Sequence, residues 1–211
     1  MAKVVTISRQ VGSLGDEIAQ AIASELQVPI LDREIVIRAA TIAGVSEESI
    51  LEAEHVPSLL ERMVSLLGQY PVTWDTDVQT TAAPPPALST NEYRRLIEEV
   101  IQSVTQTGGA VIVGHSAQIA LKDRDDILKI LVCAPFKLRV SRIREQMELS
   151  EHDAEEEVKR DDIERNNYFH SYYRVEWLDA ELYDLCINTG HLDVQTGKDI
   201  VLSAGSHIGL W

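Results

Sequence analysis

An apolar run that ends in a small-residue turn is the first feature of the sequence that can support chemistry. Residues 4–8 are Val-Val-Thr-Ile-Ser, and a glycine-containing segment, residues 9–15, follows them directly. A helical pattern comes next, in which Ile18, Ile22 and Leu26 recur every four residues. A strand, a loop and a helix in this order aim backbone N–H groups and a helix N-terminus at one place. That place suits a phosphate group.

Asp16 distinguishes this loop from a standard phosphate-binding loop. The pattern G-x-x-x-x-G-K-[ST] has lysine after its last glycine, whereas Asp16 follows Gly15 here. A carboxylate at this place repels a phosphate, by about 4 kcal/mol for unit charges at roughly 4 Å and an effective dielectric near ~20. Three compensations are open: Asp16 turns away at the helix N-terminus, it holds Mg²⁺ through water, or Arg9 neutralises it. All three predict slow or absent phosphoryl transfer, and a tight turn that binds no ligand is an equal alternative for this stretch alone.

Positive charge is scarce in the chain and is concentrated in a few places. The sequence has 19 Lys plus Arg against 34 Asp plus Glu, a net charge of −15. This balance excludes nucleic acid as a partner, and any nucleotide site must be a local basic cluster with a divalent cation. The densest basic cluster lies in one helical stretch after Pro135 and consists of Lys137, Arg139, Arg142 and Arg144. A solvated helix face is the alternative interpretation of this cluster.

The bulk composition predicts one domain over residues 1–211. The chain is 45% hydrophobic, and no apolar run reaches the length of a membrane span. The first residues do not resemble a signal peptide, so we expect a cytoplasmic protein with no membrane partner. Cys133 and Cys186 lie in apolar runs and are expected to be buried core residues.

Strands and helices alternate along the chain, which predicts an α/β fold with a parallel sheet of about five strands. Residues 32–70 should hold helices, and an apolar stripe at 59–67 indicates a core face or a homo-oligomer contact. The segment 71–90 contains Pro84-Pro85-Pro86 and is predicted to be a surface loop. The very polar stretch 150–175 should be a helix supported by pairs such as Asp161 and Arg165. The expected strands lie near residues 4–8, 28–31, 110–114, 127–133 and 184–188.

Several of these stretches resemble the cytidylate-kinase-like proteins of the P-loop nucleoside monophosphate kinase group. Residues 7–15 resemble the divergent phosphate loop of that branch. Residues 31–38, Leu-Asp-Arg-Glu-Ile-Val-Ile-Arg, resemble the segment Leu-Asp-x-Gly-x-x-Tyr-Arg that holds the monophosphate. Asp32 and Arg38 match this segment, whereas Glu34 and Ile37 depart from it.

The second half of the chain carries the rest of the resemblance. Residues 111–116 resemble the strand and Gly-Arg-Asp turn at the centre of the site, with His115 and Ser116 in place of Arg and Asp. Residues 160–167 resemble the lid run Arg-Asp-Asp-Arg-Asp-Arg-Asn-Arg and keep two of its arginines, Arg160 and Arg165. Residues 183–190 are similar to the last strand of the family.

The resemblance implies a three-layer P-loop NTPase fold with a helical lid, and transfer of the ATP γ-phosphoryl group to CMP or dCMP with Mg²⁺. This chemistry depends on phosphate positioning and positive charge. The resemblance assigns no particular residues to the metal. It implies that the donor phosphates are bound by Arg9, Gly12, Ser13 and Gly15, and the acceptor by Asp32, Arg38 and His115. It further implies Arg142 for the donor base and Arg160 and Arg165 as catalytic lid residues.

Two further hypotheses stay open beside the kinase. Asp16 and His115 both weaken the positive charge of the site, which favours a nucleotide-binding or regulatory protein that kept the fold and lost catalysis. A small-metabolite kinase on the same fold is the third hypothesis.

Overall fold

The computed structural model describes residues 3–32, 35, 37 and 90–211. Arg38, most of the predicted acceptor-side helices at 32–70, and the predicted loop at 71–90 up to residue 89 lie outside the described residues.

A five-stranded parallel sheet forms the centre of the molecule, with the strand order β2-β3-β1-β4-β5. Each strand falls where the alternation of apolar runs and helices predicts one. The predicted α/β P-loop fold is therefore confirmed. The strands are β1 (Val4–Arg9), β2 (Ile30–Leu31), β3 (Ala110–Val113), β4 (Ile127–Cys133) and β5 (Leu185–Asn188).

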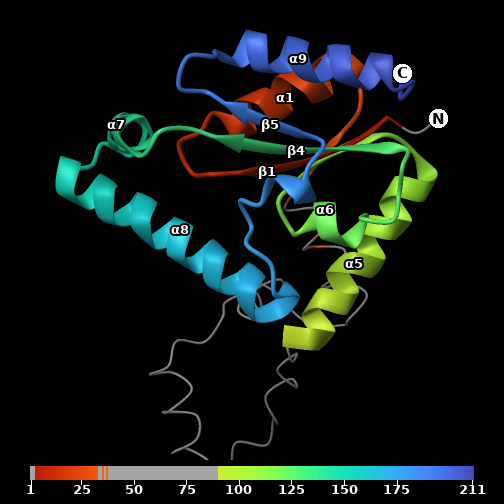
Figure 1. Cartoon of the computed structure of the whole chain (residues 1–211), viewed down its shortest axis with the longest axis horizontal. Coiled ribbons are helices and arrows are strands. Elements are labelled where there is room, and N and C mark those ends of the chain that lie inside the picture. The colour runs from red at the N-terminus through yellow and green to blue at the C-terminus, as the bar shows by residue number, and fades with distance from the viewer. Residues whose placement is uncertain (1–2, 33–34, 36, 38–89) are drawn as a thin grey trace, which may run out of the picture.

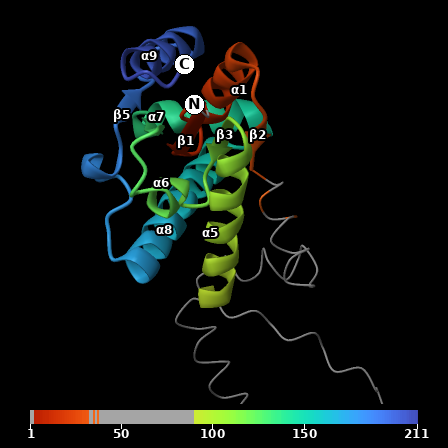
Figure 2. The same cartoon turned by 90° about the vertical axis from the view of Figure 1, so that its right-hand side faces the viewer.

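Helices cover both faces of the sheet and make three layers (Figures 1 and 2). Side chains alternate between the faces of a strand, so Val5 and Ile7 pack with one layer and Val4 packs with the other. The first layer contains α1 (Gly15–Leu26) and α9 (Val194–His207), and the second contains α5 (Thr90–Thr107), α6 (Ala117–Ala120) and much of α8 (Glu151–Tyr173).

The helix α7 (Phe136–Met147) follows β4 in the chain and lies near the carboxyl ends of β1 and β4 (Figure 1). It packs between the loop after β1 and α8. Val140 and Ile143 of α7 pack against Ala154 and Val158 of α8, and Val11 of the loop contacts the same cluster. The far end of α8 belongs to a different, aromatic cluster. Because α8 is one helix with packed side chains at both ends, its polar middle section spans the region between the two clusters.

The edge strand β5 begins one residue later than expected, and an expectation about its cysteine is wrong. Residues 180–182, just before it, form a 3-10 helix, η1 (Ala180–Leu182), and the chain enters the sheet at Leu185. Cys186 is exposed and Cys133 is half-buried, and the prediction that both are core residues is wrong. On this edge strand Ile187 is buried in the core under α1 and α9 and Leu185 is partly buried against it, whereas Cys186 and Asn188 are exposed.

In the described part of the chain, no helix combines the length and the apolar character that a bilayer crossing requires.

Candidate active site

The phosphate loop, residues 9–15, connects β1 to α1 at the carboxyl edge of the sheet. Gly12 (φ 72°) and Leu14 (φ 65°) are both left-handed, and the N–H of Ser13 donates to the carbonyl of Gln10 at 3.1 Å. Leu14 is the N-cap of α1 and provides no side-chain cap. The first-turn N–H groups of α1 are therefore left for solvent or an anion.

A buried hydroxyl lies inside the same loop. Ser13 is completely buried, and its Oγ makes no hydrogen bond within the described residues. A buried polar atom without a partner costs about 1–3 kcal/mol. Because this hydroxyl has no accessible surface, it lies beneath the uncapped N–H groups, and a ligand on the loop reaches it only if the loop rearranges.

Two glycines allow other groups to approach the loop closely. A Cβ on Gly15 would lie 2.3 Å from the Cβ of Arg9, and a Cβ on Gly12 would lie 2.8 Å from the carbonyl oxygen of Arg139. Any larger residue at Gly15 would displace the Arg9 side chain, and any larger residue at Gly12 would separate the loop from α7.

Arg9 neutralises Asp16. The Nε of Arg9 lies 3.0 Å from Oδ1 of Asp16, and its Nη2 lies 3.7 Å from Oδ2 of Asp32. The Arg9 side chain is only 17% exposed, and a Cβ on Gly114 would lie 2.8 Å from its Nη1. Of the three compensations considered for Asp16, the structure contains this one. The same guanidinium connects the phosphate loop with the residues that follow β2 and β3.

The turn after β3 places His115 against Asp32. His115 and Ser116 are left-handed (φ 52° each), as is Gly114 (φ 76°), a conformation that costs roughly 1–2 kcal/mol for each residue that is not glycine. The Nε2 of His115 lies 3.0 Å from Oδ1 of Asp32. Strain at a polar turn of this kind is typical of functional sites.

The surroundings of Asp32 favour its charged form. Burial raises the pKa of the Asp32 carboxyl, but the hydrogen bond from His115 and the positive charge of Arg9 outweigh this effect, and Arg165 adds to them. The pKa of Asp32 is therefore lowered. An ionised carboxylate only accepts hydrogen bonds, so Nε2 of His115 is the donor of this pair.

This lowered pKa makes a prediction about stability. Because the folded-state pKa of Asp32 lies below the unfolded value of about 3.9, its charge stabilises the fold at pH 7, and the stabilisation is lost as pH falls through the folded pKa. We expect Asp32→Asn to be less stable than wild type at pH 7 in urea unfolding, and the difference to shrink as the pH falls below the ordinary aspartate pKa of about 3.9. The matched control is Asp125→Asn, at an exposed aspartate. An Asp32→Asn difference that does not change with pH would contradict the lowered pKa.

The lid arginines point in different directions. Arg165 pairs with Asp161 at 2.8 Å, as the sequence predicts, and lies 5.7 Å above the ring of Trp177. Its charge also contributes to the lowered pKa of Asp32. Arg160 has a side chain that is 62% exposed and pairs with Glu157 and Glu164 on its own helix. The two arginines are five residues apart, which places them about 140° apart around an α-helix.

An ion pair that sequence reasoning missed joins α7 to α8. Arg139 is 3% exposed, and its guanidinium binds both carboxylate oxygens of Asp162, at 2.7 and 3.1 Å. Its Nε also donates to the carbonyl of Ala134 at 3.2 Å. The basic cluster contains Arg139, but no local pattern indicates that its partner lies on the next helix.

Arg142 of α7 connects the phosphate loop with Thr189, the residue that follows β5. Its guanidinium donates to the carbonyl of Gly12, and to the hydroxyl and carbonyl of Thr189, at 3.0 Å in each case. These bonds use the edges of the guanidinium, and a ring can still stack on its face.

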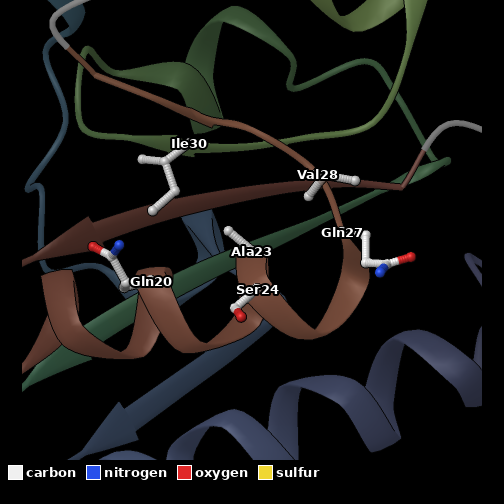
Figure 3. A pocket seen from close by; sticks show the side chains of 6 residues that line it. All are labelled: Gln20, Ala23, Ser24, Gln27, Val28 and Ile30. Carbon is white, nitrogen blue, oxygen red and sulfur yellow. The ribbon is translucent and has the colours of Figure 1, made fainter.

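A separate groove lies along the second half of α1 and the segment that leads into β2 (Figure 3). It is lined by Gln20, Ala23, Ser24, Gln27, Val28 and Ile30. The end of α1 that lines this groove is opposite the end that follows the phosphate loop, and the lining contains no charged residue. We therefore place the candidate site at residues 9–16, 32, 114–116 and 139–165.

Comparisons with known proteins show which family the chain resembles in sequence. The profile of the cytidylate kinase-like family matches residues 4–191. The cytidylate kinase of Staphylothermus marinus is 28% identical over 125 residues, which are 59% of this chain and 67% of that protein. That of Methanothrix thermoacetophila is 31% identical over 114 residues, 54% of this chain and 64% of that protein. The chain thus spans about two thirds of the length of these relatives.

Solved structures show the same fold. An uncharacterized protein from Eubacterium ventriosum superposes with a TM-score of 0.68 at 18% identity, over 97% of this chain and 98% of that one. A shikimate kinase from Bacteroides thetaiotaomicron gives 0.50 at 8% identity, over 97% and 98%. These structures support the fold alone, whereas the family profile covers most of the sequence. The chain belongs to the cytidylate kinase-like family.

Proposed function

We propose that the protein transfers the γ-phosphoryl group of ATP to a nucleoside monophosphate, with CMP or dCMP as the acceptor. Membership of the cytidylate kinase-like family supports nucleotide-dependent phosphoryl transfer. The observation that carries the proposal is the position of Arg9. Its guanidinium lies at the first turn of α1, within 3.7 Å of carboxylates on both the donor and the acceptor side.

In this proposal each part of the site has one task. The N–H groups around Gly12, Ser13 and Gly15 bind the donor phosphates, and Arg9 supplies the charge that a loop lysine gives elsewhere. Asp32, oriented by His115, accepts a hydrogen bond from the acceptor, and Arg38 holds its phosphate. The remaining assignments are Arg165 and Arg160 for charge on the transferring group and Arg142 for the donor base.

The residues at the start of α1 are suited to Mg²⁺. Asp16 and Glu17 are adjacent first-turn carboxylates, and Mg²⁺ prefers one or two carboxylates together with substrate phosphates and water. The Asp16 side chain is 67% exposed and uses only Oδ1 towards Arg9, which leaves Oδ2 available. Bound Mg²⁺ would neutralise charge on the phosphates. Arg9 and Asp16 would then orient the nucleotide on the loop.

One observation favours the second hypothesis, a nucleotide-binding protein with little or no catalysis. The arginines Arg9, Arg139, Arg160 and Arg165 all pair with carboxylates in the structure. A phosphate must displace these carboxylates before it gains the full charge, so binding depends on a cation. A small-metabolite kinase is the third hypothesis, since Asp32 can accept a hydrogen bond from any hydroxyl. A cytoplasmic location and a homo-oligomeric assembly remain predictions.

The test is a panel of nucleotides against the purified protein, measured by heat of binding with and without Mg²⁺, together with ADP formation. Saturable ATP binding with CMP-dependent ADP formation is the expected result. ATP binding without ADP formation for any monophosphate would favour the binding protein. ADP formation only with a small hydroxyl compound would favour the metabolite kinase, and no nucleotide binding would reject the proposal.

We also expect residues 150–175 to act as a lid. The middle of α8 presents Asp161, Asp162 and Arg165 as half-buried side chains and has no buried apolar residue between Val158 and Phe169. Hydrogen exchange of the N–H groups in residues 159–168 should therefore slow when ATP and CMP are added together. Exchange in α9 serves as the internal control. Unchanged exchange in α8 at saturating ligand would contradict the lid role.

A further inference from the structure

Two successive carbonyls of the phosphate loop are held from outside the loop. The carbonyl of Gly12 accepts from Nη1 of Arg142 at 3.0 Å, and the carbonyl of Ser13 accepts from the hydroxyl of Thr189 at 2.8 Å. Arg142 also donates to the hydroxyl and carbonyl oxygens of Thr189, so the two donors form one unit. Thr189 follows β5, and its N–H donates to the carbonyl of Cys133 at 2.9 Å.

The planarity of the peptide bond gives these contacts a consequence on the opposite side of the loop. In a trans peptide the N–H points away from the C=O of the same plane. The carbonyl of Ser13 shares its plane with the N–H of Leu14. A hydroxyl that fixes this carbonyl on the Thr189 side therefore fixes the N–H of Leu14 on the other side, next to the first turn of α1.

Leu14 needs this support because its own conformation is unfavourable. It is an aliphatic residue with φ 65°, a region that non-glycine residues avoid. Without the bond from Thr189, rotation of the plane between Ser13 and Leu14 would relieve the strain and turn the N–H away. The geometry thus shows a loop held by its tertiary contacts in a strained arrangement.

We propose that Thr189 is a positioning residue of the phosphate loop, whose hydroxyl keeps the N–H of Leu14 aimed at the donor phosphates. This inference rests on the proposed function. Thr189 is 1% exposed, so it acts through Ser13 and makes no contact with nucleotide itself. Arg142 completes the arrangement by orienting the Thr189 hydroxyl and the preceding peptide plane.

The test compares Thr189→Val with Thr189→Ser. Valine keeps the shape and removes the hydroxyl, and serine keeps the hydroxyl. Thr105→Val is the matched control, because Thr105 is also 1% exposed and its hydroxyl bonds the carbonyls of Ile101 and Gln102 in α5, far from the loop. The measurements are the dissociation constant of Mg-ATP by heat of binding and hydrogen exchange of residues 13–16 without nucleotide.

We expect Thr189→Val to raise the dissociation constant about tenfold, the size of one lost hydrogen bond, and to speed exchange at Leu14. Thr189→Ser should stay within about twofold of wild type, and Thr105→Val should change neither measurement. Equal effects of Thr189→Val and Thr105→Val, or no rescue by serine, would overturn the proposal. Absence of nucleotide binding by wild type would reject the proposed function, and unchanged exchange at Leu14 in Thr189→Val would then separately overturn the loop-positioning role.

Discussion

Arg9→Met should lower the affinity for Mg-ATP by about 100-fold. Methionine approximates the length of the side chain but removes the guanidinium, which lies 3.0 Å from Asp16 and 3.7 Å from Asp32. The variant loses charged hydrogen bonds to phosphate, worth about 1.5–3 kcal/mol, and leaves two carboxylates that repel the nucleotide. Without Mg²⁺, Asp16→Asn should act in the opposite direction and raise the affinity for ATP by about tenfold, because Arg9 is then no longer held by a carboxylate. With Mg²⁺ the same substitution also removes a proposed ligand of the cation, so the gain should disappear. Heat of binding with and without Mg²⁺ measures both changes.

The control for this charge change is Arg95→Met. Arg95 lies on α5, its side chain is 76% exposed, and it pairs with Glu99. Arg95→Met removes the same charge from the chain but far from the loop, so the affinity for Mg-ATP should stay within about twofold of wild type. Arg9→Lys should fall between wild type and Arg9→Met. If neither Arg9→Met nor Asp16→Asn changes the affinity, the loop after β1 does not bind the donor phosphates.

Arg139→Met should destabilise the protein by about 3 kcal/mol. Loss of one partner from a buried ion pair leaves the other charge uncompensated, which typically costs about 3–5 kcal/mol. We take the lower end, because Asp162 is 29% exposed and water can reach it. For a chain of this size the melting temperature should fall by roughly 6–12 °C in calorimetry.

A second substitution separates the uncompensated charge from lost packing. The double variant Arg139→Met, Asp162→Leu removes both charges and should recover a large part of the stability, since apolar replacement of a whole buried pair is often neutral. Lys159→Met on the same helix is the control, because its pairs with Glu155 and Glu156 are exposed and contribute little. A single Arg139→Met variant as stable as Lys159→Met would show that the pair does not hold α8.

The sequence predicted the sheet because the strands carry strong local patterns. The buried runs at β3 and β4 are nearly continuous, as expected for strands covered on both faces. The pair of Asp161 and Arg165 was also predictable, since four-residue spacing on a helix brings side chains together. β5 was expected near residues 184–188 and spans Leu185–Asn188, directly after the 3-10 helix η1 and residues 183–184.

The candidate site was predictable only where neighbours in sequence meet. The interaction of Arg9 with Asp16 spans seven residues and was one of three alternatives. The pair of Arg139 and Asp162 depends on how α7 packs against α8, and no periodicity within either helix specifies it. By contrast, the outward direction of Arg160 follows from helical geometry alone. Five residues separate it from Arg165, so on a regular helix the two side chains start about 140° apart, and Arg160 must leave Glu157 and Glu164 to turn towards the site.

The bond from Thr189 to Ser13 has a consequence for protein synthesis. The two residues are 176 positions apart in the chain, although their atoms lie 2.8 Å from each other. At a translation rate of about 5–20 residues per second, roughly 9–35 s pass between the synthesis of the loop and that of the threonine that fixes it. During that interval β1 and α1 can associate on the ribosome, but the peptide plane after Ser13 has no partner. The loop therefore reaches its final form only as one of the last events of folding during synthesis.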